Sequence, residues 1–291
     1  MTKICDLLSA RRSVSVELWP PRSLASEERL EAALVELAEK VQPAFCSITY
    51  GAGGSTRERT HELVTRIRRE GQMVPMAHLV VAAHTRADLV GILERYREAG
   101  VENVLALQGD PPLDSAVPVP TGELRMALEL AELAKELGDF CVAVAAHPEG
   151  HPDLDDLRTD RRYLAEKLRV ADFAITQFFF NPQDYFNLVD DIAALGIDRP
   201  IVPGIMPITN VRTVTRMAQM SGRQVPRDLA GRIEAVSDQP DEVRKIGVEV
   251  ATSLGETLLA GGAPGLHFYT MNQSRATIEV CANLGIGAGI A

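Results

Sequence analysis

Short apolar runs alternate with longer amphipathic stretches along the whole chain. Most of the runs have no polar face, which is typical of strands that are buried on both sides. Nearly every run also delivers a polar residue toward its C-terminal half. The runs predict eight strands, at 13–19, 45–49, 76–81, 104–107, 141–146, 173–180, 201–205 and 266–269.

The stretches between the runs have helical periodicity. In the first of them Leu30, Leu34 and Leu37 fall on one face, and Glu27 lies in the opening turn, where the helix dipole favours anions. Two later helices are expected to begin at residue pairs with capping-box spacing and to stop at glycines. These signals are Ser55 with Glu58, Thr85 with Asp88, Gly71 and Gly100.

Eight strands alternating with helices over about 250 residues favour a TIM-type (β/α)8 barrel. We expect residues 1–291 to form one such barrel as a single α/β domain. A doubly wound open sheet is the alternative. In a barrel, the catalytic groups would come from the C-terminal ends of the strands.

Composition narrows the function classes. The chain is 46% hydrophobic and has a formal net charge of -10, which disfavours a nucleic-acid surface. Its four cysteines are widely spaced, as expected for reduced thiols in a cytoplasm. We find no signal peptide and no apolar span near 20 residues, so we expect a soluble cytoplasmic protein without a membrane partner. A homo-oligomer is compatible with the sequence.

Two carboxylates are candidates for chemistry. Glu17 lies within an apolar strand, where burial would raise its pKa toward the range of a general acid, although an ion pair with an arginine is an equal alternative. Asp110 follows the strand at 104–107 and would face a pocket, unless it only caps a turn. The amide of Gln177, inside another strand, needs hydrogen-bond partners and could bind a heterocycle.

Two loops invite a ligand interpretation. His147 and His151 are separated by Pro-Glu-Gly and followed by a second proline, which breaks the helix that a paired histidine site needs, so we predict ligand contacts and no metal. The glycine-rich stretch 50–55 could bring backbone N–H groups to a phosphate or a flat ring, but it lacks the dinucleotide and P-loop spacings. Trp19 and the phenylalanines at 178–180 are expected to pack.

The residues resemble the methylenetetrahydrofolate reductase family, which reduces 5,10-methylenetetrahydrofolate to 5-methyltetrahydrofolate on a (β/α)8 barrel. Eight motifs in order carry the resemblance over nearly the whole length. They are VELWPPR at 16–22, SITYGA at 47–52, AHL at 77–79, ALQGDP at 106–111, HPEGHP at 147–152, ITQFFF at 175–180, PGIMP at 203–207 and HFYTMN at 267–272.

The resemblance implies roles for the matching residues. Glu17 corresponds to the general acid that helps to open the folate ring to an iminium, and Asp110 to the acid near the pterin and the flavin. The implied tetrahydrofolate contacts are Gln177, Asp110, Met217 and Gln273. The implied cofactor contacts are Thr49, His78, Gln108, Gly109, His147, His151, Asp160 and Lys167.

Three positions depart from the family pattern. Gln108 and His147 stand where the family has arginine and tyrosine on the flavin side, and Gln273 replaces another arginine. Loss of a charge-assisted contact to an anionic cofactor costs about 1.5 to 3 kcal/mol, or roughly one to two powers of ten in affinity. The resemblance implies FAD, and these departures count against it.

Two routes for hydride therefore stay open. NADH or NADPH would reduce FAD, which then reduces the folate in a ping-pong cycle, or the nicotinamide would give hydride directly to the iminium. We favour the direct route, with NADH as the donor.

The alternatives to a reductase are a catalytically silent folate-binding barrel, or a barrel lyase or hydrolase. Five lysines, none within a strand core, count against a Schiff-base lyase. We expect no C-terminal regulatory domain of the kind found in eukaryotic relatives.

Overall fold

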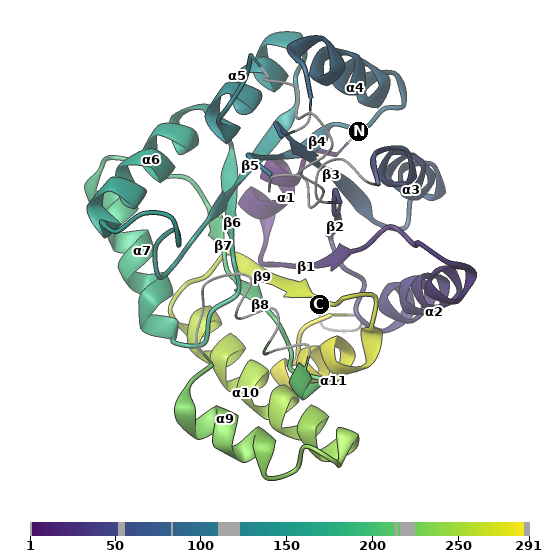
Figure 1. Ribbon diagram of the computed structural model, residues 1–291, viewed down its shortest axis with the longest axis vertical. Coiled ribbons are helices and arrows are strands. Elements are labelled where there is room, and N and C mark those ends of the chain that lie inside the picture. Colours follow the sequence, from purple (N-terminus) through teal and green to yellow (C-terminus); the bar gives the residue numbers. More distant parts are fainter. Residues whose placement is uncertain are drawn as a thin grey trace, which may run out of the picture.

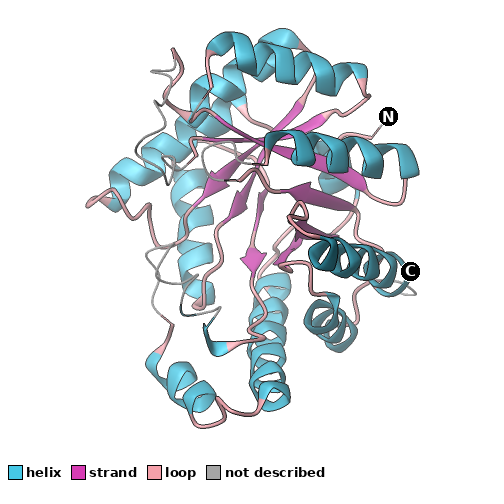
Figure 2. Cartoon of the chain, turned by 45° about the vertical axis from the view of Figure 1, so that its right-hand side comes forward, coloured by secondary structure: helices cyan, strands magenta, loops and turns pink. Residues whose placement is uncertain are grey.

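A ring of parallel strands surrounded by helices dominates the computed structural model (Figures 1 and 2). The structure describes residues 2–51, 56–82, 84–109, 123–212, 215 and 225–287. The strands are β1 Ser13–Leu18, β2 Phe45–Ile48, β3 Val74–Val80, β4 Asn103–Leu107, β5 Cys141–Ala146, β6 Phe173–Thr176, β7 Ile201–Val202, β8 Gly204–Ile205 and β9 Gly265–Tyr269. The helices are α1 Ile4–Ala10, α2 Leu24–Lys40, α3 Arg57–Glu70, α4 Arg86–Glu98, α5 Ala127–Leu137, α6 Leu157–Val170, α7 Pro182–Ala194, α9 Arg227–Glu234, α10 Pro240–Ala260 and α11 Ser274–Leu284.

The strand order shows that the sheet closes on itself. Every strand pairing among the described residues is parallel, and the order is β7-β6-β5-β4-β3-β2-β1-β9-β8. The two end strands, β7 and β8, are separated in sequence by Pro203 alone, so they are halves of one strand and the nine pieces fill eight positions. The predicted (β/α)8 barrel is confirmed, and the open sheet is excluded.

A glycine permits the closure between β8 and its neighbours. A Cβ atom on Gly204 would lie 2.4 Å from the backbone oxygen of Thr176 and 2.5 Å from the ring of Tyr269. The Gly204 N–H also donates to Thr176 Oγ1 at 2.9 Å. A side chain at this position would force Thr176 or Tyr269 to move, so the glycine permits the close approach of the strands here.

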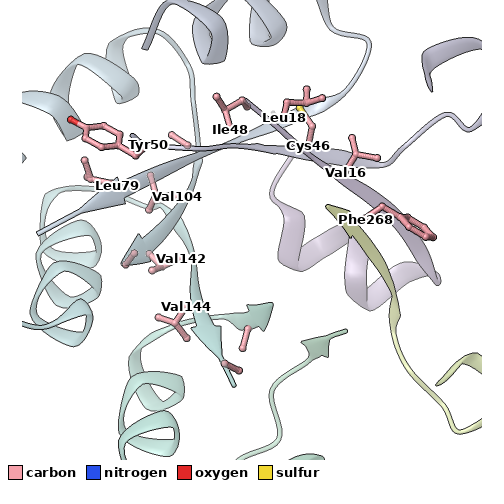
Figure 3. Close-up of a cluster of buried hydrophobic side chains, with 14 of the residues drawn as sticks. Val16, Leu18, Cys46, Ile48, Tyr50, Leu79, Val104, Val142, Val144 and Phe268 are labelled. Atoms are coloured by element: carbon pink, nitrogen blue, oxygen red, sulfur yellow. The ribbon is translucent and has the colours of Figure 1, made fainter. Parts of the chain in front are cut away.

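The strands carry two apolar layers. Side chains that point outward, such as Val16, Leu18 and Val144, pack with the surrounding helices in the main core (Figure 3). Side chains that point inward form a separate cluster that includes Phe45 and Phe173. This inner cluster fills the barrel near the amino ends of the strands and leaves their carboxyl ends for polar groups.

Helix α1 closes the amino end of the barrel, and the sequence patterns did not predict it. Ile4 and Leu8 are buried in the inner cluster. The Ile4 N–H donates to Oδ1 of Asn103, the first residue of β4, at 2.9 Å. With one end closed in this way, a ligand of the barrel has to approach from the carboxyl ends of the strands.

The predicted helix boundaries agree with the observed ones except at the start of α3. The capping box of Thr85 with Asp88 is confirmed, and Gly71 and Gly100 adopt positive φ where α3 and α4 stop. Helix α3 has Thr56 as its N-cap residue, and Ser55 lies outside the described residues.

The predicted strand at 173–180 is too long, because β6 ends at Thr176. The chain then turns toward α7, which starts at Pro182, and buries Phe178 and Phe179 on the way. Among the helices that the structure describes, none is long and apolar enough to span a membrane.

Candidate active site

A layer of neutral polar side chains lies inside the barrel above the apolar cluster. Ser15 Oγ lies 2.9 Å from Nδ1 of His267, and Ser47 Oγ lies 3.4 Å from its Nε2. The imidazole also stacks on Phe45, with ring centroids 6.1 Å apart. Burial lowers the pKa of His267 to about 3, so the ring is neutral at physiological pH. This layer forms the floor beneath the carboxylate of Glu17.

Glu17 extends inward near the end of β1. Strand register places it beside Ser47 on β2 and Tyr269 on β9. Its side chain is 12% exposed, and Oε1 accepts a hydrogen bond of 3.1 Å from the indole N–H of Trp19. Burial raises the pKa of Glu17 to about 7, while the indole hydrogen bond acts in the opposite direction. A carboxyl group with this pKa can hold a proton near neutral pH and also release it.

His78 faces Glu17 from β3. Its Nε2 lies 3.8 Å from Oε2 of Glu17, and this buried nitrogen makes no hydrogen bond within the part of the chain that the structure describes. Burial lowers the pKa of His78 to about 3. The contact is therefore not an ion pair at neutral pH, and His78 supplies no positive charge that would lower the pKa of Glu17.

Tyr269 and Gln177 continue this rim of the barrel. The Tyr269 hydroxyl donates to the backbone oxygen of Thr176 at 2.6 Å, and burial together with the nearby Glu17 charge raises the pKa of Tyr269. Gln177 follows Thr176 directly, and its backbone N–H donates to Ala146 O at 2.8 Å. Gln177 thus directly follows Thr176, whose carbonyl oxygen accepts the hydrogen bond from Tyr269, and Tyr269 is the neighbour of Glu17 in the sheet.

Four of the predicted cofactor residues meet at the carboxyl end of β5. The rings of His147 and His151 are 4.7 Å apart and nearly perpendicular, and Asp160 Oδ1 accepts from the His151 backbone N–H at 3.2 Å. Lys167 Nζ donates to Ala145 O at 2.8 Å. Burial lowers the pKa of Lys167 to about 8, against the opposing effect of Asp160. No cluster of three or more His, Cys, Asp or Glu side chains able to hold a metal occurs among the described residues.

Arg161 holds this loop in place, and the sequence patterns did not predict its role. Its side chain is only 4% exposed, and its Nη1 lies 3.0 Å from Asp160 Oδ2. It also binds Asp191 and donates to the backbone oxygens of His147 and Pro148. The charge of Asp160 is therefore balanced inside the protein.

The remaining predicted contacts are more dispersed. Thr49 directly follows β2, and Gln273 is exposed at the N-cap of α11. Gln108 is exposed after β4, and Gly109 has φ of 81°, with room for no Cβ because Val80 Cβ would lie 2.8 Å away. Asp110 and Met217 lie outside the described residues.

A signal for the polar layer was present in the sequence. In β1, Ser13, Ser15 and Glu17 alternate with valine and leucine, and in β9 His267 and Tyr269 alternate in the same way. Alternation with period two places these polar side chains on one face of each strand. Of these side chains, Glu17 was predicted to lie at the site, whereas the rest of the polar face that points into the barrel was not predicted.

Comparison with known proteins agrees with this geometry. A profile described as methylenetetrahydrofolate reductase matches residues 2–285. The chain belongs to the methylenetetrahydrofolate reductase family. The predicted family, and with it the prediction of an enzyme of this family, is confirmed.

Curated members of the methylenetetrahydrofolate reductase family resemble the chain over most of its length. A 5,10-methylenetetrahydrofolate reductase of Pectobacterium carotovorum is 33% identical over 285 residues, covering 98% of this chain and 94% of the relative. The Escherichia coli protein of the same name is 32% identical, with 96% and 92% covered. Methylenetetrahydrofolate reductase (NADH) 1 of Arabidopsis thaliana is 35% identical over 94% of this chain, which spans 48% of the plant protein.

Solved structures support the barrel fold of this family member. An uncharacterised Clostridium thermocellum protein that binds two copies of 5-methyl-5,6,7,8-tetrahydrofolic acid superposes with a TM-score of 0.65 at 14% identity, covering 97% of this chain and 98% of that one. Dihydropteroate synthase from Xanthomonas albilineans has a TM-score of 0.52 at 15% identity, with 95% and 94% covered. At these identities the likeness concerns the fold alone.

Proposed function

We propose that this chain reduces 5,10-methylenetetrahydrofolate to 5-methyltetrahydrofolate at the carboxyl end of the barrel, with a reduced nicotinamide as the source of hydride. Family membership supports the reaction. The observation that carries the mechanism is the buried carboxyl group of Glu17, whose pKa is raised to about 7. Asp110, Gln177, Met217 and Gln273 are the proposed folate contacts.

Glu17 acts as the general acid in this proposal. Its proton passes to the ring nitrogen that leaves, the carbon–nitrogen bond breaks, and the electron pair of that bond stays on the nitrogen. The carbon becomes an iminium, which accepts a hydride and ends as a methyl group, while the nicotinamide is oxidised. A carboxyl group that is half protonated near neutral pH suits this transfer, because it is available as an acid and is not too weak to give up its proton.

The test is Glu17→Gln, which keeps the size of the side chain and removes the acid. We expect turnover to fall by about 10² to 10⁴, with folate affinity retained. The matched control is Glu166→Gln on the exposed face of α6, which should leave both quantities unchanged. Near-normal turnover of Glu17→Gln would remove the acid role.

The predicted cofactor contacts that the structure describes fit a tightly held FAD poorly. FAD, when bound, supplies a ring that accepts hydride from a nicotinamide and passes it on. Its phosphates need cations, but within the described part of the set Lys167 is the one cationic side chain, and Asp160 and Asp191 already occupy Arg161. Gln108 adds no charge where the family has arginine.

We therefore propose that hydride passes directly from NADH to the iminium. A nicotinamide dinucleotide that binds and leaves in every turnover needs only modest affinity, which a site with the single lysine Lys167 can supply. An iminium carbon is a strong electrophile, so the protein has only to hold the two reacting carbons at near-attack distance. Thr49, His78, Gly109, His147, His151, Asp160 and Lys167 are the proposed dinucleotide contacts.

The absorbance of the purified protein and its steady-state kinetics distinguish the two routes. The direct route predicts a colourless protein, intersecting lines when NADH and folate are varied together, and transfer of deuterium from labelled NADH to the methyl group without exchange. A yellow protein with parallel lines would establish the flavin route and overturn the direct one. NADPH, tested in parallel, would settle the preference for NADH.

A further inference from the structure

Trp19 makes a contact that packing does not explain. Its side chain is 39% exposed, although it is the largest apolar side chain of the motif around Glu17. The indole N–H donates to Oε1 of Glu17 at 3.1 Å, two residues earlier in the chain. The expectation that Trp19 serves for packing therefore misses its polar contact.

The backbone of Trp19 is held on both sides by one residue. Asn272 Oδ1 accepts from the Trp19 N–H at 2.9 Å, and Asn272 Nδ2 donates to the Trp19 carbonyl at 2.9 Å. Asn272 has φ of 57° and Met271 has φ of 50°, so the loop after β9 adopts an uncommon left-handed conformation that brings the amide to this position. The loop fixes the point from which the indole reaches Glu17.

We propose that Trp19 is a positioning residue for the acid, with Asn272 as its support: the indole N–H orients the Glu17 carboxyl group and stabilises the negative charge that forms when the proton leaves. This inference rests on the proposed role of Glu17. A hydrogen bond to a carboxylate is stronger than one to a neutral carboxyl group, so the contact strengthens as the proton is transferred. Removing the indole N–H would make Glu17 a weaker acid.

The other groups that face Glu17 do not provide this stabilisation. His78 on β3 is neutral because it is buried, and Ser47 on β2 is a neutral hydroxyl group directed at His267. Tyr269 on β9 directs its hydroxyl hydrogen to Thr176 O. Among the described neighbours, Trp19 is therefore the donor that contacts the carboxyl group.

The sequence offers a direct probe, because Trp19 is the only tryptophan in the chain. Its fluorescence can be titrated without folate or nicotinamide, so the result does not depend on the proposed reaction. We expect emission to change with a midpoint near pH 7 in the unmodified protein, and we expect this transition to be lost in Glu17→Gln. If the two proteins titrate alike, Trp19 does not sense Glu17 and the proposal is overturned.

The second measurement is the pH profile of kcat. Trp19→Phe keeps the ring and removes the donor, so we expect the alkaline limb to move upward by about one pH unit and kcat to fall by about tenfold, with a smaller change in KM. Asn272→Gly, which tolerates the positive φ, should move the limb in the same direction by less. The control Tyr163→Phe, an exposed aromatic on α6, should leave it in place. An unmoved limb in Trp19→Phe would contradict the proposal even if kcat fell.

Discussion

Oε2 of Glu17 lies 3.8 Å from Nε2 of His78, and both groups are neutral between about pH 3 and pH 7. Burial is the main cause in each case, and it acts on the two side chains in opposite directions, since it raises the pKa of the acid and lowers the pKa of the base. The pair therefore keeps its proton on the carboxyl group. This arrangement suits a site that has to donate a proton.

The first prediction concerns the pH dependence of turnover. The proposed role of Glu17 requires its protonated form, so kcat should be highest below about pH 7 and should fall about tenfold per pH unit above it. His78→Asn should leave this limb within about half a unit, because the imidazole is already neutral. Measurement of kcat between about pH 5 and pH 9 tests both statements. A clear shift of the alkaline limb in His78→Asn would show that the limb does not report Glu17 alone and would contradict the prediction.

The second prediction concerns stability. A carboxyl group whose pKa is raised in the folded state binds more protons there than in the unfolded chain, so stability should fall as the pH rises from about 4.5 to about 7 and then level off. Glu17→Gln removes this cost. We expect its gain in unfolding free energy over the unmodified protein to be larger at pH 8 than at pH 5 by about 2 to 3 kcal/mol, as measured by urea unfolding. A difference that does not change with pH would argue against a raised pKa.

The third prediction compares two neighbouring arginines. Arg161→Ala should destabilise the protein by about 3 kcal/mol, because it leaves Asp160 buried without its partner and frees the carbonyl groups of His147 and Pro148. Arg162→Ala, which removes an exposed contact to Thr159, should cost less than about 0.5 kcal/mol. Thermal unfolding of both variants measures the difference, and equal losses would show that the buried pair contributes little.

The fourth prediction concerns two glycines. Gly204→Ala should cost about 1 to 3 kcal/mol, since its Cβ would overlap Thr176 O and the ring of Tyr269. Gly91→Ala, inside α4 with nothing within 4 Å, should instead stabilise the protein by up to about 1 kcal/mol. Denaturant midpoints of the two variants should therefore move in opposite directions. A neutral Gly204→Ala would show that the barrel can adjust at this point.

Local patterns in the sequence were sufficient for the barrel but not for all of its site. Apolar runs separated by capped helices predicted the strands, because burial on two faces demands such runs wherever a parallel sheet is covered by helices. The position of Glu17 within a strand was visible for the same reason. Its raised pKa also depends on a neutral His78 from another strand, and that pairing arises only when the ring closes.

The parts that the sequence did not predict depend on contacts between distant segments. Helix α1 is short, and its place is fixed by Asn103 and the interior of the barrel, neither of which its own periodicity reveals. The link between Trp19 and Asn272 spans most of the chain and requires a left-handed loop. No local propensity encodes an amide that meets a backbone so far away in sequence.

The interruption at Pro203 has a consequence for motion. Proline has no N–H to donate, and the strand pieces on either side are two residues long and bond to different neighbours, β6 and β9. We therefore expect the sheet to open most easily at this junction. In native-state hydrogen exchange, the backbone amides of Val202 and Ile205 should exchange faster than those of β1. Local opening there would loosen the carboxyl end of the barrel next to Tyr269, while the strands on the opposite side of the barrel stay hydrogen-bonded.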